Sequence, residues 1–261
     1  MKRVYIGVGH GGKDSGAVKY LVEKDVNLKM ALACRDYLKA AGVDTMISRE
    51  NDKEVSINEK VRQANEFNAD IALDIHNNAG RGKGFEIYHT INGGIGKMLS
   101  VNIEKEIVAI GQNSRGLKTK KGANGDYFGF IRLTKMPAVI PEGVFVDNLE
   151  DASLANTDEK CKKFGQAYAK GILATLEIKT TTEQEQAAAK PELIHVDTYK
   201  VKVTSSELNI REDAGTKHAV TGVIRDKGVY TIVAEKIVSE QKWGKLKSGA
   251  GWICLAYTKK I

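Results

Sequence analysis

Residues 3–12 read RVYIGVGHGG. An apolar, β-branched run that ends in glycines is typical of a buried strand followed by a sharp turn. The turn carries His10 at the carboxyl end of this strand, which is where sites form in open α/β sheets. Glycines on both sides of His10 let the backbone turn and approach a ligand closely. The stretch therefore predicts the first strand of an α/β sheet and the position of a site beside it.

Strand and helix patterns alternate from this stretch to residue 177. The expected strands cover residues 3–9, 43–49, 69–76, 84–90, 128–133 and 138–146. The expected helices cover residues 23–41, 56–67, 95–110 and 158–177. Ser56, followed three residues later by Glu59, forms a capping box at the start of the second helix. Strands that alternate with helices indicate an α/β fold with a mostly parallel central sheet flanked by helices.

The sequence changes character after residue 177. Residues 178–198 contain the polar run KTTTEQEQAAAKPE and are expected to form an exposed linker. Residues 199–261 consist of short β-rich runs separated by glycine turns, which is typical of a small all-β barrel. We therefore expect a first domain at 1–177, a linker at 178–198 and a small barrel at 199–261.

Composition and charge limit the classes of function. The chain is 42% hydrophobic and 28% charged, as expected for a globular protein rather than a disordered one. Its net charge of +7 favours a polyanionic partner, namely nucleic acid, an anionic membrane surface or an acidic wall polymer. Residues 195–261 hold twelve Lys and Arg against seven Asp and Glu, so most of the excess positive charge lies in the tail. The three cysteines are far apart and show neither a disulfide framework nor zinc-binding spacing.

The N-terminal run is interrupted by glycines within a few residues, unlike a secretory signal peptide. No stretch approaches the roughly 18 apolar residues that a membrane span needs. The sequence therefore predicts synthesis in the cytoplasm without a signal peptide and without an integral membrane segment.

Residues 7–12 formally match the dinucleotide-binding pattern GxGxxG. That pattern requires its last glycine at a helix N-terminus, whereas the convincing helix here begins only near Glu23. The alternative is that the turn presents His10 as a metal ligand. His76 ends the third expected strand at the same edge of the sheet, and Glu23 begins a helix beside it. Two histidines and one carboxylate with an open position suit a catalytic zinc ion.

Residue types alone leave other interpretations open. A histidine at a strand end is commonly a polar residue with its hydrogen bonds satisfied. Glu142 follows an apolar strand and Pro141, and an apolar setting raises a carboxyl pKa toward the range of a general acid/base. A solvated loop glutamate is the alternative for this residue.

Six ordered segments carry a family resemblance: GHGGKDSGA, EKDVNL, the arginine of MISR, VRQAN, ADIALDIHNNA and PEGVFVDN. Together they closely resemble the zinc-dependent N-acetylmuramoyl-L-alanine amidases of bacterial autolysins and phage endolysins, over residues 2–176. The resemblance implies one catalytic Zn²⁺ held by His10, Glu23 and His76, with Glu142 as the catalytic glutamate. The implied reaction is hydrolysis of the amide between N-acetylmuramic acid and L-alanine in peptidoglycan.

The chain departs from the family pattern at two positions. The family usually has proline at the place of Ser15 and commonly serine at the place of Asp74. Period-2 alternation puts Asp74 on the same face as His76, where it either tunes the metal site or is a solvated substitution. Asn78, in the family's HxN motif, and His89 are candidate substrate-binding residues.

The tail resembles bacterial SH3-like (SH3b) cell-wall-binding domains. The matching parts are LNIRE and the combination of WGKL with GWI. The resemblance implies wall binding, with Trp243, Trp252 and Tyr257 available to stack on glycans or peptide stems. In so small a barrel at least one tryptophan is expected in the core, and Trp252 is the first candidate.

The leading hypothesis is a modular peptidoglycan amidase that acts on the bacterial cell wall after release. This organisation resembles a phage endolysin released by a holin-type partner, and a bacterial autolysin shares the same features. A zinc peptidase that cuts within the stem peptide would use the same residues. A catalytically inactive wall-binding protein is disfavoured because all four site residues are present. Nucleic acid is not expected as a partner, because the basic residues form no helical stripe and the aromatic residues match no RNA-binding motif.

Overall fold

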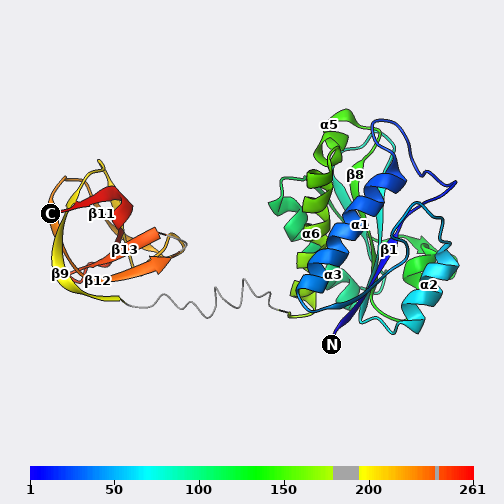
Figure 1. Cartoon of the computed structure of the whole chain (residues 1–261), viewed down its shortest axis with the longest axis horizontal. Coiled ribbons are helices and arrows are strands. Elements are labelled where there is room, and N and C mark those ends of the chain that lie inside the picture. The colour runs from blue at the N-terminus through cyan, green and yellow to red at the C-terminus, as the bar shows by residue number, and fades with distance from the viewer. Residues whose placement is uncertain (179–193, 239–240) are drawn as a thin grey trace. The chain divides into compact units, whose positions relative to one another are not determined.

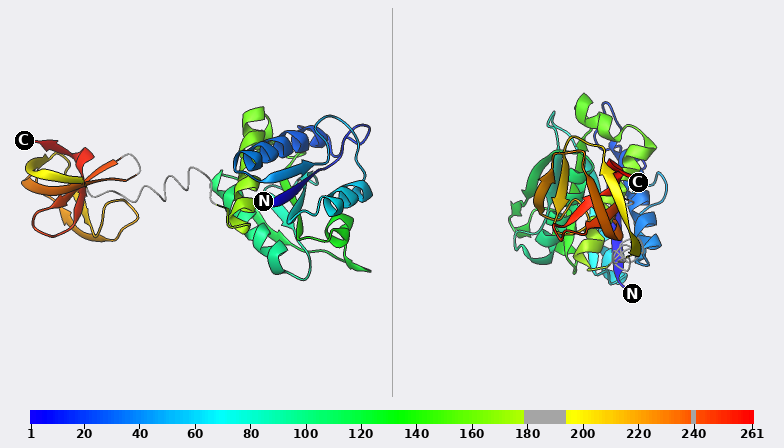
Figure 2. Two further views of the ribbon diagram at one scale, coloured as in Figure 1. Left: turned by 60° about the horizontal axis from the view of Figure 1, so that its bottom comes forward. Right: turned by 90° about the vertical axis from the view of Figure 1, so that its left-hand side faces the viewer.

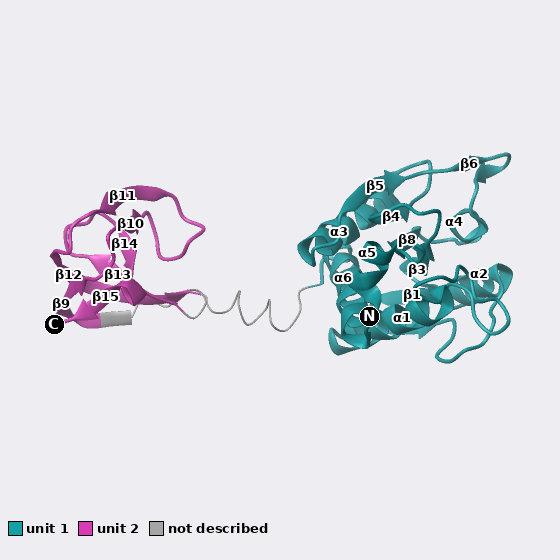
Figure 3. Cartoon of the chain, turned by 90° about the horizontal axis from the view of Figure 1, so that it is seen from above, with its two compact units in different colours: residues 1–181 teal, residues 182–261 magenta. Residues whose placement is uncertain are grey.

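A computed structural model describes residues 1–178, 194–238 and 241–261. The chain separates into two compact units, Met1–Thr181 and Thr182–Ile261, which Figures 1 and 3 show as distinct bodies. Most of the predicted linker, 178–198, lies outside the described residues. The strand β9 begins at Ile194, before the expected start of the barrel at residue 199.

Unit 1 is an α/β layer structure, in agreement with the sequence. Its six-stranded sheet has the order β2-β1-β3-β8-β4-β5. The pairs are parallel except β4 with β8, so β4 and β5 run opposite to the other four strands. These strands are β1 (Arg3–Val8), β2 (Asp44–Ile47), β3 (Ile71–Asn78), β4 (Phe85–Tyr88), β5 (Ser114–Lys118) and β8 (Ala138–Phe145). The prediction of a mostly parallel sheet is therefore confirmed.

Helices cover both faces of this sheet. The long helices are α1 (Glu23–Ala40), α2 (Ile57–Glu66), α3 (Gly94–Ala109) and α6 (Asp158–Thr175). The shorter elements are α4 (Gly129–Leu133), α5 (Leu149–Ala152), η1 (Ser153–Ala155) and the two-residue strands β6 (Lys121–Gly122) and β7 (Gly125–Asp126). Figure 1 shows α6 and α2 on opposite sides of β1, and Figure 2 gives two further views of the same layers.

Strand alternation divides the core into two parts. Val4, Ile6 and Val8 of β1 pack in the larger core with buried residues of α1, α3 and α6. Tyr5 points to the other face and packs with buried residues of α2 and α4. Successive side chains of a strand point to opposite faces, so the first strand reaches both cores.

The predicted strand at 128–133 is wrong, because this segment forms helix α4. Phe130 and Ile131 are adjacent in sequence, and both are buried in the smaller core. A strand would send these two side chains to opposite faces, whereas a helical turn can direct both to one side. Arg132 holds the turn by donating to the carbonyl oxygens of Asp126 and Tyr127.

Unit 2 is an all-β body with one seven-stranded sheet in the order β11-β10-β14-β13-β12-β9-β15. All of its strand pairs are antiparallel. Its elements are β9 (Ile194–Val203), β10 (Leu208–Arg211), β11 (Val220–Ile224), β12 (Val229–Val238), β13 (Gln241–Leu246), β14 (Trp252–Cys254), η2 (Leu255–Tyr257) and β15 (Thr258–Lys260). The expectation of an all-β tail is confirmed. Among the helices described in both units, none is long and apolar enough to cross a membrane.

Candidate active site

The loop between β1 and α1 places His10 at the carboxyl edge of the sheet. His10 adopts a φ of 57°, and Gly11 and Gly12 follow with φ of 138° and 59°. Asp14 closes this turn through two backbone hydrogen bonds with Gly11, of 2.8 and 3.1 Å. A Cβ atom at Gly16 would lie 2.7 Å from the ring of His10 and 2.6 Å from Oε2 of Glu23. The glycines therefore allow the backbone to lie close to the side chains of His10 and Glu23, as the glycines of residues 3–12 suggested.

Three side chains from this loop, α1 and β3 converge on one point. Nε2 of His10 and Nδ1 of His76 each lie 3.1 Å from Oε1 of Glu23. One ligand atom from each of the three residues lies within 4.8 Å of the other two. The imidazole rings meet edge to face, with centroids 4.9 Å apart. The structure thus brings together three residues that are far apart in the sequence.

This donor set fits zinc. Zinc binds imidazole nitrogen and carboxylate oxygen at about 2.0–2.2 Å, so two ligands of a tetrahedral ion lie about 3.3–3.5 Å apart. The 3.1 Å separations within the cluster are close to this spacing. The side chains of His10 and His76 are 24% and 22% exposed, so the cluster opens to solvent. A catalytic ion needs such an open side for substrate and water.

Glu23 is held in place as an ionised carboxylate. It is only 4% exposed, and it accepts hydrogen bonds from the amides of Ala17 (2.9 Å) and Asn77 (3.2 Å). Burial acts to raise the pKa of Glu23, but contacts with His10 and His76 outweigh burial and hold the pKa well below its usual range. The carboxylate is therefore available as a negatively charged ligand.

Glu142 lies beside this cluster on the neighbouring strand β8. It pairs in register with His76 of β3 on one side and with Glu86 of β4 on the other. Burial raises the pKa of Glu142 to about 7; His76 opposes the rise, and Glu23 and Glu86 add to it. A carboxyl group with this pKa can both accept and donate a proton near neutral pH, which suits a general acid/base.

Comparison with known families places this geometry in context. The profile of the Amidase_3 family, described as N-acetylmuramoyl-L-alanine amidase, matches residues 4–174, which include the three clustered residues and Glu142. The chain belongs to the N-acetylmuramoyl-L-alanine amidase family. The matched segment lies within unit 1, so the family assignment concerns the α/β unit that carries the site.

Some relatives match beyond this segment. The sporulation-specific N-acetylmuramoyl-L-alanine amidase of Bacillus subtilis (strain 168) is 32% identical over 219 residues, which is 82% of this chain and 82% of the relative. An endolysin of Bacillus phage SPP1 is 29% identical over 269 residues, which is 95% of this chain and 94% of the endolysin. The similarity to the endolysin therefore extends into unit 2.

Solved structures share the α/β fold. Cwp6 from Clostridium difficile is 37% identical with a TM-score of 0.65, and the match covers 67% of this chain and 29% of Cwp6. The catalytic domain of CwlV, an N-acetylmuramoyl-L-alanine amidase from Bacillus (Paenibacillus) polymyxa var. colistinus, is 29% identical with a TM-score of 0.63. That match covers 69% of this chain and 100% of the CwlV domain.

A second polar network in this amidase family member borders Glu142. Glu86 is 7% exposed and accepts hydrogen bonds from Nε of Arg115 (2.6 Å) and Nδ2 of Asn78 (3.2 Å). Asn78, predicted to bind substrate, thus supports Glu86, and its Oδ1 also accepts from the amide of Ala79. Sequence reasoning missed Glu86 and Arg115. The available signal was a glutamate between Phe85 and Ile87 in an apolar strand, a setting in which a charged residue needs a partner.

His89, the other candidate substrate-binding residue, is buried. It is 6% exposed, and its Nδ1 lies 2.8 Å from the carbonyl oxygen of Thr90. Its substrate-binding role stays a prediction, which this burial disfavours.

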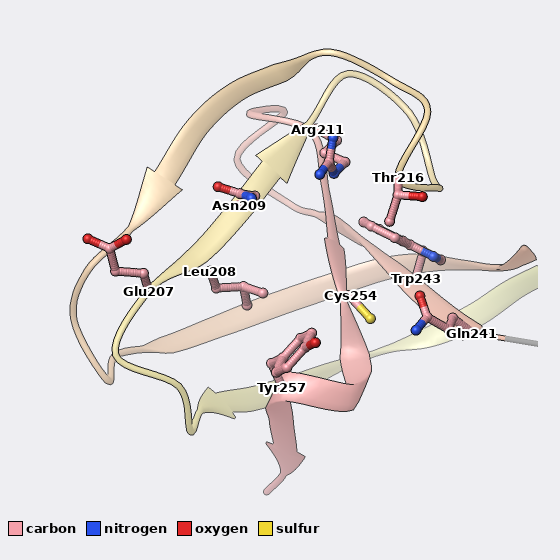
Figure 4. A pocket seen from close by; sticks show the side chains of 9 residues that line it. All are labelled: Glu207, Leu208, Asn209, Arg211, Thr216, Gln241, Trp243, Cys254 and Tyr257. Carbon is pink, nitrogen blue, oxygen red and sulfur yellow. The ribbon is translucent and has the colours of Figure 1, made fainter. Parts of the chain in front are cut away.

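The amidase chain has a separate cavity of about 390 Å³ in unit 2. Figure 4 shows the side chains that line it, which come from β10, β13, β14, η2 and the loops before and after β10. Tyr257 is 51% exposed at this cavity, whereas Trp243 and Trp252 are only 3% and 5% exposed. Trp252 is in the core, as expected. Trp243 is buried as well, so it can act in binding only as part of the cavity lining, and Tyr257 is the accessible aromatic residue.

Proposed function

We propose that this chain hydrolyses the amide bond between N-acetylmuramic acid and L-alanine with one Zn²⁺ held by His10, Glu23 and His76. The observation that carries the proposal is the convergence of these three ligand atoms within 4.8 Å, next to Glu142 in strand register with His76. Membership of the amidase family supports the choice of bond. The donor chemistry of two imidazoles and one carboxylate supports zinc.

Bound zinc would supply a Lewis acid that polarises the amide carbonyl and makes water more acidic. The protein supplies the proton transfers. Glu142 takes a proton from the water that attacks the carbonyl carbon and passes it to the nitrogen of L-alanine as the C–N bond breaks. Its pKa of about 7 suits both halves of this transfer.

We further propose that unit 2 is an SH3-like domain that binds the cell wall through the cavity beside Tyr257. Its lining combines Tyr257 with Glu207 and Arg211, and these groups suit a ligand with apolar and charged parts, such as a stem peptide. The basic residues of the tail favour an anionic wall polymer in addition.

Mass spectrometry of digested peptidoglycan tests the bond specificity. Incubation of purified peptidoglycan with the full chain should produce new L-alanine amino termini and free lactyl groups. New termini within the stem peptide would instead identify a stem peptidase. Peptidoglycan that is incubated with the Glu142→Gln variant in parallel should release the amidase products about 10²–10⁴-fold more slowly.

A metal analysis tests the cofactor separately. The purified chain should contain about one equivalent of zinc, and removal by a chelator should abolish cleavage until zinc is restored. Full activity of the metal-depleted protein would contradict the proposed zinc site while leaving the bond assignment intact.

A further inference from the structure

A buried ion pair between α2 and β3 lies next to the candidate zinc site. Nζ of Lys60, on α2, donates to both carboxylate oxygens of Asp74 at 2.8 and 3.0 Å. Each residue is only 3% exposed. A carboxylate and an ammonium group are costly to remove from water, so a buried pair of this kind calls for a local explanation. The structure excludes the interpretation of Asp74 as a solvated substitution.

The sheet makes room for this pair. Asp74 and His76 lie on one face of β3. Gly7 in β1 and Gly9 just after β1 lie next to them. A Cβ atom at Gly7 would lie 2.5 Å from Oδ1 of Asp74, and one at Gly9 would lie 2.4 Å from the ring of His76. The two glycines therefore create adjacent spaces, one for the carboxylate and one for the imidazole.

Asp74 approaches the side of the His76 ring that faces away from Glu23 and His10. Its Oδ2 lies 3.5 Å from Nε2 of His76, whereas Nδ1 of the same ring lies 3.1 Å from Glu23. An imidazole that binds a metal through one nitrogen needs its proton on the other, and a carboxylate beside that nitrogen favours this tautomer.

We propose that the Lys60–Asp74 pair is a positioning device that keeps the proton of His76 on Nε2 and so presents Nδ1 to the metal. This inference rests on the proposed zinc site. Asp74 orients the ring through the Nε2 side, and Lys60 balances the carboxylate charge in the buried space beneath it.

His10 offers an internal comparison. Its Nδ1 lies 2.7 Å from Oδ2 of Asp14, and its Nε2 faces Glu23. The side chain of Asp14 is 52% exposed, and hydrogen bonds from solvent can satisfy its charge there. Asp74 is enclosed, so its charge must be balanced by a protein group. Each of the two histidines thus has a carboxylate beside the nitrogen that faces away from Glu23. Of these two carboxylates, the buried Asp74 is the one that is paired with a lysine.

Zinc titration of double variants tests the role of Asp74 without leaving a charge unpaired. Lys60→Met with Asp74→Leu removes both charges and the acceptor beside Nε2. Lys60→Met with Asp74→Asn removes the charges but keeps an acceptor. We expect the Leu variant to bind zinc about 10–100-fold more weakly, and the Asn variant to recover part of this loss.

Asp151→Asn is the matched control. Asp151 is fully buried and accepts hydrogen bonds from Gln112 and from the amide of Phe145, but it does not contact the histidines of the cluster. This variant should lower Tm without weakening zinc binding. Unchanged zinc affinity in the Lys60→Met, Asp74→Leu variant would overturn the inference, even if that variant also had a lower Tm. Absence of zinc binding by the unaltered chain would overturn the proposed zinc site itself.

A spectroscopic measurement reports the tautomer directly. In the ¹⁵N NMR spectrum of the zinc-loaded full chain, His76 should show a protonated Nε2 and a metal-bound Nδ1, while His10 should show the reverse. The signals can be assigned from single histidine variants. A metal-bound Nε2 at His76 would contradict the inference while leaving zinc binding in place.

Discussion

The two histidines of the candidate site present different nitrogens to the same carboxylate oxygen. His10 uses Nε2 and His76 uses Nδ1. His10 extends from a turn with a φ of 57°, whereas His76 projects from β3, which lies between β1 and β8. The two rings reach this point in different orientations, with their planes 81° apart. Asp14 and Asp74 then occupy the remaining nitrogen of each ring.

The first prediction concerns Glu142, whose side chain borders the cluster but is not one of its ligands. Glu142→Gln should keep one equivalent of zinc and lower kcat on peptidoglycan about 10²–10⁴-fold, because the amide cannot transfer the proton. Metal content and kcat are measured on the same preparation. Glu159→Gln, on the exposed first turn of α6, should leave both values unchanged. Substantial activity in Glu142→Gln would assign the proton transfer to another group.

The second prediction concerns the pH dependence of kcat/KM. Glu142 must be ionised to accept a proton, so activity should fall as pH drops through its pKa. That pKa is about 7, and the charge of bound zinc lowers it further, so the midpoint should lie at or below this value. Glu86 adds to the rise of this pKa; Glu86→Gln should therefore shift the acidic limb to lower pH. If the acidic side of the pH profile does not shift in Glu86→Gln, then Glu86 does not affect the pKa of Glu142.

At the level of elements, the long strands and helices of unit 1 were predictable because their apolar periodicity is regular. Helix α2 begins where the sequence indicated, since Oγ of Ser56 accepts the amide of Glu59 at 3.2 Å. The segment 128–133 was mistaken for a strand because alternating aromatic residues imitate period 2. Only tertiary packing, which buries Phe130 and Ile131 on one side, identifies it as helix α4.

For the candidate site too, residues in short local motifs could be predicted from the sequence, whereas residues defined by distant contacts could not. His10 and Glu23 lie in the loop after β1 and at the start of α1, whereas His76 and Glu142 lie within β3 and β8. Short sequence motifs around all four residues identified them as candidates. No such motif marks Lys60 or Glu86. Their structural roles depend on ion pairs with residues of other elements, Asp74 and Arg115. A lysine in an amphipathic helix normally predicts a solvated side chain, and only the packing of α2 against the sheet shows that this one is buried.

The third prediction concerns Gly9, which lies just after β1. Gly9→Ala would place a Cβ atom 2.4 Å from the ring of His76, so the ring must move and zinc affinity should fall at least about tenfold. Gly96→Ala is the control, since its Cβ meets only ordinary contacts of 3.6 and 3.8 Å and alanine favours the helix. The control should bind zinc normally with an unchanged or higher Tm. Equal zinc affinity in both variants would show that His76 tolerates displacement.

At the level of the whole molecule, the two units differ in architecture and in the task proposed for each. Unit 1 contains the complete candidate site, since all four proposed residues lie within Met1–Thr181. Unit 2 has its own hydrophobic cores, built around residues such as Ile232 and Trp243, and its own cavity. Linking a catalytic unit to a wall-binding unit raises the effective concentration of the active site at an insoluble substrate, with no new contact at the bond that is cleaved.

The fourth prediction follows from this division. A fragment of residues 1–181 should fold, bind zinc and cleave a soluble muropeptide with the kcat of the full chain, because it keeps the whole site. On intact walls it should be slower than the full chain, and added salt should narrow the difference because charge screening weakens the attraction of the basic tail. Rates on both substrates, at low and high salt, check this. A fragment that matches the full chain on intact walls would remove the wall-binding role of unit 2, whereas an unfolded fragment would show that the α/β unit depends on residues beyond 181.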